Sequence, residues 1–127
     1  MTFIKNHALS LFLTAVIVFL SLFPFGPIEL AADVPLADKW THMLMYAVLS
    51  LALAWEFHRT NDRGSWLQFC AVVFVVPTIL GGLLELAQAY CTDYRSGEWL
   101  DFVADSIGAL AGLLIGACMS GRKKLHV

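Results

Sequence analysis

Residues 66–90 read WLQFCAVVFVVPTILGGLLELAQAY and contain a single charged residue, Glu85. About 20 mostly apolar residues are enough for an α-helix to cross the hydrocarbon core of a bilayer. The segment therefore predicts a membrane-spanning helix. A carboxylate inside such a helix costs free energy, so its position is informative about function.

Three further segments resemble this one in composition. Residues 8–25 carry no charge, residues 38–57 are apolar with polar groups at intervals, and residues 99–119 carry two aspartates. The connections are short, which favours antiparallel packing of sequential helices. The sequence thus predicts an all-α fold, a single membrane domain over residues 1–127 built as a four-helix bundle.

The overall composition excludes several other classes of protein. Of the 127 residues, 59% are hydrophobic and 14% are charged, whereas soluble domains have roughly 45–50% and about 25%. A soluble domain of this size could not cover so much apolar surface. The net charge of −2 gives no attraction for nucleic acid. Cys70, Cys91 and Cys118 are too widely spaced for a disulfide framework or a metal-binding pair.

The basic residues predict an orientation in the membrane. With a cytoplasmic N-terminus, six of the Lys and Arg residues lie inside, and Lys39 and Arg95 lie outside. Cytoplasmic loops carry an excess of Lys and Arg. The four tryptophans fall near predicted helix ends, where Trp favours the membrane interface. We therefore expect both termini to be cytoplasmic.

Polar residues of three predicted helices lie at a similar depth near the outer face. His42 and Tyr46 follow Asp38 at intervals of four residues, so all three share one helix face. Glu85 and Asp105 each lie roughly 7 to 9 Å along the helix from its outer end. A shared depth predicts a polar pocket open to the outer leaflet. Its candidate ligand-binding residues are Asp38, His42, Tyr46, Glu85, Gln88, Arg95, Asp101 and Asp105.

Several uses of this polar layer fit the residues. It can be a structural network that fixes helix register, or a pocket for the head group of a lipid. It can also be catalytic, with His42 or Glu85 as general base. The spacing of the histidine and carboxylates matches no strong metal-binding motif, so we expect neither a metal nor a cofactor.

Two blocks of sequence resemble the VanZ-like family. The first is D-K-x-x-H-x-x-x-Y-x-x-L, from Asp38 to Leu49. The second extends from Gly81 to Gly112 and follows the family's pattern G-x-x-x-E-x-x-Q … R … D … N-x-x-G-x-x-x-G at all positions but one. The resemblance covers residues 36–116. Asp105 stands where the family usually has Asn, and this adds an ionisable group to the layer.

The resemblance implies a multi-pass protein of the bacterial cytoplasmic (inner) membrane. The name-giving member is associated with resistance to the glycopeptide teicoplanin, so the resemblance implies a role in envelope biology. The expected partner is a membrane lipid or a lipid-linked cell-wall precursor. One alternative is a small intramembrane hydrolase or transferase that uses His42 and Glu85, although no Ser/His/Asp arrangement accompanies them. Another alternative is a structural subunit that binds a partner protein.

Small residues and a proline predict two features of helix packing. Gly108, Gly112 and Gly116 recur every four residues, which lets another helix approach closely. That helix can belong to the same chain or to a second copy in a homo-oligomer. Pro77 removes one backbone hydrogen bond, which predicts a kink before Gly81.

Overall fold

The computed structural model describes residues 2–22, 37–60, 64–91 and 99–119. These residues are almost entirely helical and include no β-strand, which confirms the all-α prediction for this part of the chain. The elements in chain order are α1 (Thr2–Asn6), α2 (Ala8–Leu22), α3 (Ala37–Thr60), α4 (Trp66–Cys70), the π-helical turn η2 (Ala71–Val75), α5 (Val76–Cys91) and α6 (Trp99–Met119).

The predicted helix bounds agree closely with the observed ones. The segment 99–119 coincides with α6, and α4, η2 and α5 form one continuous helix over residues 66–91. The helix α3 continues three residues beyond the predicted end at residue 57. Residues 23–25 of the first predicted segment lie outside the described residues.

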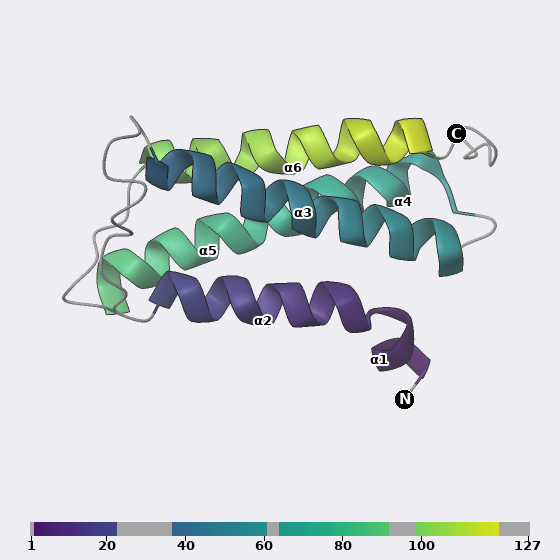
Figure 1. Cartoon of the computed structure of the whole chain (residues 1–127), viewed down its shortest axis with the longest axis horizontal. Helices are drawn as coiled ribbons and strands as arrows, with labels where there is room; N and C mark the ends of the chain where they lie inside the picture. The colour runs from purple at the N-terminus through teal and green to yellow at the C-terminus, as the bar shows by residue number, and fades with distance from the viewer. Residues whose placement is uncertain (1, 23–36, 61–63, 92–98, 120–127) are drawn as a thin grey trace.

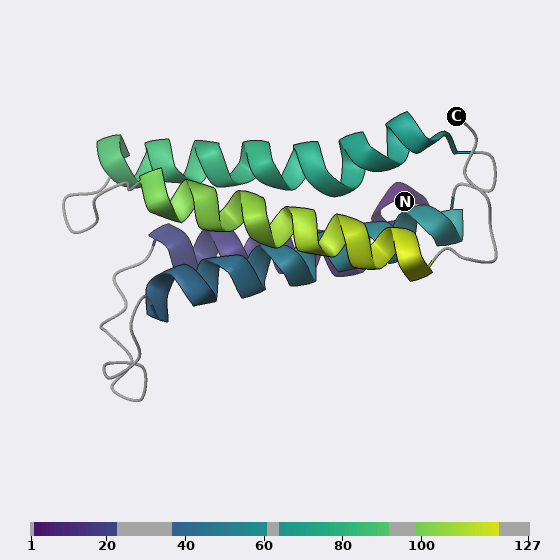
Figure 2. The ribbon, with the colours of Figure 1, turned by 90° about the horizontal axis from the view of Figure 1, so that it is seen from above.

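The long helices lie side by side (Figures 1 and 2). Lys39 pairs with Asp101 near the starts of α3 and α6, and His58 contacts the Gly116 carbonyl near their ends. The two helices therefore run in the same direction. Helix α2 runs the opposite way, because Ser10 near its start contacts Glu56 near the end of α3. Helix α5 runs with α2, because their last turns meet where Gln88 donates to the Ser21 carbonyl at 2.7 Å. Sequential neighbours are thus antiparallel in the described chain.

Glycines of α6 set the closest helix contact. A Cβ atom on Gly108 would collide with the Met43 carbonyl, and one on Gly112 would collide with Ser50. Both partners belong to α3, so the glycine stripe is covered within one chain. Association of two copies through Gly108, Gly112 and Gly116 stays a prediction, and it would have to use a face that α3 already covers.

The disturbance expected at Pro77 takes the form of the π-helical turn η2. Proline lacks an N–H group, so the carbonyl four residues earlier, that of Val73, loses its usual α-helical donor. Ser50 supplies another, since its Oγ donates to the Val73 carbonyl at 2.8 Å. Ser50, Val73 and Pro77 are fully buried. The irregular turn is therefore bonded to α3 rather than left open.

Two helices are long and apolar enough to cross a membrane, Trp66–Tyr90 and Trp99–Met119. Four such segments were expected. The helix α2 is apolar but has only 15 residues, and α3 has 24 residues with several charged ones. Length and composition therefore support two of the four predicted spans.

The glycine contact gives a stability test. Gly108→Ala places a methyl group against backbone, which cannot move aside easily, and we expect a loss of about 1–3 kcal/mol. Gly82→Ala is the matched control, because its Cβ would meet only a Phe102 ring edge at 3.2 Å. Alanine is also the better helix former, so this change should be nearly neutral. Thermal unfolding of both purified variants checks the difference, and equal melting temperatures would contradict the packing.

Candidate functional site

His42 is the centre of a polar cluster near the starts of α3 and α6. Its Nδ1 atom lies 2.9 Å from Oδ1 of Asp105, and its Nε2 atom lies 3.8 Å from Oδ2 of Asp101. Both aspartates are buried, and Asp105 is only 1% exposed. Asp101 and Asp105 are one helical turn apart on α6, so each faces a different nitrogen of the same imidazole ring.

Lys39 supplies a positive charge one turn before His42. Its Nζ atom donates to Oδ1 of Asp101 at 2.7 Å, and both side chains are largely buried. From the sequence, Lys39 contributes only to the predicted orientation and is not included in the candidate site. Its place directly after Asp38, within the first motif, was the available signal.

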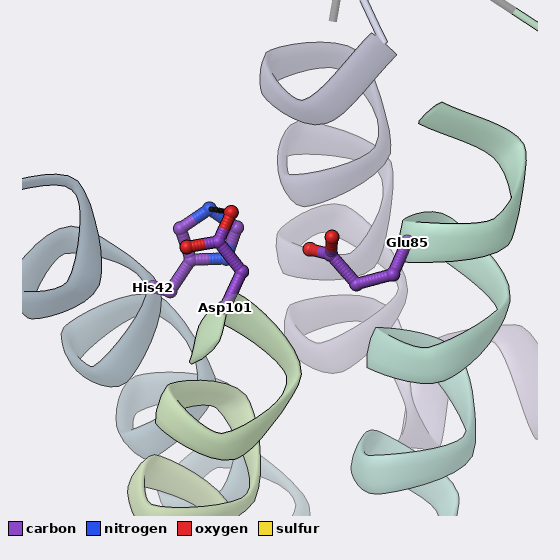
Figure 3. A group of neighbouring side chains, drawn as sticks. All are labelled: His42, Glu85 and Asp101. Atoms are coloured by element: carbon purple, nitrogen blue, oxygen red, sulfur yellow. Dashed lines mark ion pairs between the residues drawn. The ribbon is translucent and has the colours of Figure 1, made fainter. Parts of the chain in front are cut away.

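Glu85 reaches the same cluster from α5. Figure 3 shows its carboxylate pointing from α5 toward His42 and Asp101. His42, Glu85 and Asp101 each offer one atom that could bind a metal ion, and these three atoms lie within 4.8 Å of one another. Three helices that are far apart in the sequence therefore converge at one point, as their predicted depths indicated.

Two predicted site residues have contacts elsewhere. Tyr46 is 1% exposed and packs in an apolar cluster with Leu84, one turn beyond His42 along α3. Gln88 donates to the carbonyl of Ser21, which joins α5 to the last turn of α2. Besides this packing, the Tyr46 hydroxyl interacts electrostatically with Asp105 and Glu85, so Tyr46 borders the cluster, whereas Gln88 connects α5 to α2.

Two more predicted site residues cannot be placed. Asp38 belongs to the first turn of α3, but its side chain is not among those described. Arg95 lies outside the described residues altogether. Their roles in the pocket stay predictions.

An apolar groove of about 520 Å³ lies between α5 and α6. Tyr90 and Trp99 line it near the end of α5 and the start of α6, and Thr78 lines it farther along α5. Glu85 belongs to its wall as well as to the polar cluster. The groove can hold an apolar chain while the cluster binds a polar group attached to that chain. Its full lining is Thr78, Ile79, Gly82, Leu83, Glu85, Leu86, Ala89, Tyr90, Trp99 and Phe102.

A second buried carboxylate, Glu56, lies at the opposite end of α3. It is 1% exposed and accepts hydrogen bonds from the Ser10 backbone N–H at 3.0 Å and from Ser10 Oγ at 2.6 Å. His7 Nδ1 lies 3.3 Å away. Because the first turn of a helix has N–H groups without internal partners, Glu56 caps α2. The spacing of Glu56 in the sequence does not show which helix start it meets, so this cap could not be predicted.

The Glu56 cap predicts a loss of stability in its absence. Glu56→Ala leaves the buried Ser10 backbone N–H without an acceptor and leaves Ser10 Oγ with only the His7 carbonyl at 3.1 Å, which should cost about 1–3 kcal/mol. Glu56→Gln keeps one side-chain oxygen and should lose less. Thermal unfolding of the two variants measures the effect. Wild-type stability in Glu56→Ala would show that the cap contributes nothing.

Comparisons with known proteins give one distant relative. The chain is 29% identical over 121 residues to "Uncharacterized protein C11E3.10" of Schizosaccharomyces pombe, an alignment that covers 94% of this chain and 68% of the yeast protein. No family model matches the sequence. No solved structure matches it.

Proposed function

We propose that this chain is a membrane-embedded, VanZ-like protein that binds the head group of a lipid in the cluster around His42. The proposal rests on the position of Glu85, which borders both the apolar groove and the polar cluster. A lipid has the same division, with an apolar chain joined to a polar head. The site therefore offers each part of a lipid a matching surface.

The distribution of apolar side chains supports a membrane location. In the two helices long and apolar enough to cross a membrane, Trp66–Tyr90 and Trp99–Met119, only 28% and 33% of the residues in the most apolar stretch are buried inside the protein. Large apolar side chains face outward on the other helices too, among them Phe12 of α2 and Leu44 of α3. Soluble monomers rarely expose continuous apolar surface on this scale. We propose that α2 and α3 also span the membrane, in a four-helix bundle with both termini cytoplasmic.

The class of lipid follows from the groove and from the relative. Yeast is a eukaryote, and its related protein favours a ligand common to many membranes, such as a phospholipid, over a precursor specific to bacterial cell walls. In a bacterial cytoplasmic membrane, the same site would act in envelope biology. The resemblance to the VanZ-like family extends this proposal to resistance against teicoplanin-type glycopeptides.

Lipid that co-purifies with the protein tests the proposal. Ala89→Trp fills the groove, and Glu85→Gln removes its one carboxylate. Each should lower the amount of bound lipid, measured by native mass spectrometry, by about tenfold, which corresponds to about 1.4 kcal/mol. Leu114→Trp is the matched control, because Leu114 is exposed on α6 and does not line the groove. Equal lipid in all three variants, or none in the wild type, would reject the proposal.

A further inference from the structure

The pairing with Asp105 fixes which nitrogen of His42 is available. An ionised carboxylate only accepts hydrogen bonds, so Nδ1, at 2.9 Å from Oδ1 of Asp105, carries the ring proton. In the neutral ring, Nε2 then has a free lone pair. That lone pair faces Oδ2 of Asp101 at 3.8 Å, and the Glu85 carboxylate approaches the same point. Three electron-pair donors from three helices thus converge.

We propose that this point binds a divalent metal ion of the zinc type, held by His42 Nε2, Glu85 and Oδ2 of Asp101. Metal–ligand bonds of about 2.0 to 2.2 Å place neighbouring ligand atoms roughly 3 to 3.5 Å apart. One ligand atom of each residue lies within 4.8 Å of the other two, and Nε2 of His42 is 3.8 Å from Oδ2 of Asp101, so we expect side-chain rotations to bring the three ligands to bonding distance. Imidazole together with carboxylates favours zinc and related ions over magnesium or calcium.

The neighbouring side chains form the surroundings that such an ion requires. A metal-binding histidine almost always donates its other ring N–H to a carboxylate or carbonyl, and Asp105 occupies that position. Lys39 binds Oδ1 of Asp101, which leaves Oδ2 directed toward His42. The positions of Asp105 and Lys39 therefore orient two of the three ligands.

The charges in the cluster also favour a divalent cation. With all three carboxylates ionised and His42 neutral, the described side chains of Glu85, Asp101 and Asp105 contribute three negative charges and Lys39 contributes one positive charge. This leaves a net charge of −2, which a divalent ion would cancel. A neutral cluster is the favourable arrangement inside a bilayer, where isolated charges are costly. The metal site does not depend on whether a lipid occupies the groove.

Metal binding by the full chain tests the inference. The protein is purified in lipid nanodiscs with a tag free of histidine, with Cys70, Cys91 and Cys118 changed to Ser. It is stripped with a chelator and then dialysed against Zn²⁺ or, separately, Mg²⁺. We expect one zinc ion per chain by mass spectrometry of the metal, and no magnesium. Zinc should also raise the melting temperature of this protein.

Variants assign the ligands. Loss of a side chain that hydrogen-bonds a metal ligand typically weakens metal affinity about 10- to 100-fold, so Asp105→Asn should fall in that range. Glu85→Gln and Asp101→Asn each remove a ligand and should fall at or beyond its upper end. Glu56→Gln, a buried carboxylate at the other end of α3, is the control and should keep the affinity within about twofold. Because Asp101→Asn also loses the Lys39 pair, Glu85→Gln is the deciding variant.

Two results would overturn the metal site. One is a wild-type protein that retains no zinc and shows no zinc-dependent rise in melting temperature. The other is a Glu85→Gln variant that binds zinc as tightly as the wild type. The first result would mean that the contacts of His42 with Asp101 and Asp105 hold the cluster together without an ion. The second would mean that zinc binds without Glu85 and therefore not at the proposed point. Neither result depends on the amount of lipid that co-purifies.

Discussion

The close contact between α3 and α6 is the constraint on which the rest of the structure depends. Gly108 and Gly112 have no side chain on the face that meets α3, so the two backbones approach directly. Asp101 and Asp105 precede these glycines on the same face of α6. The register between α3 and α6 that places the glycines against α3 therefore also places Asp105 opposite His42. The contact between α3 and α6 therefore determines both how these helices pack and which of their polar side chains meet.

The described helices combine buried carboxylates with large apolar side chains that face outward. Buried carboxylates lie at both ends of α3, in the cluster around His42 and at the cap formed by Glu56. Apolar side chains such as Phe12 and Leu114 face outward. Each buried carboxylate has a specific role, because Asp105 orients a ring and Glu56 caps a helix. Such partners are what allows a charged group to be buried, since a buried charge without one is costly.

Helix positions and the depth of the polar layer could be predicted from the sequence. Long apolar runs define helices, and a rise of 1.5 Å per residue gives depth, so His42 and Glu85 were expected at one level. The contacts between polar side chains could not be predicted, because they depend on the register between helices that are distant in the sequence. Gln88 shares the layer by spacing, yet it contacts α2. Lys39 and Glu56 lie near helix ends, where charges are usually solvated, so their burial was missed.

The central claim is that the polar cluster lies inside the membrane and opens toward one side. Single cysteines at positions 42, 85 and 105, in a chain without its native cysteines, test it most directly. A membrane-impermeant thiol reagent should label them when it is added from outside the cell, and not when it is added to inside-out vesicles. Labelling only from the cytoplasmic side, or at none of the three positions, would contradict the account.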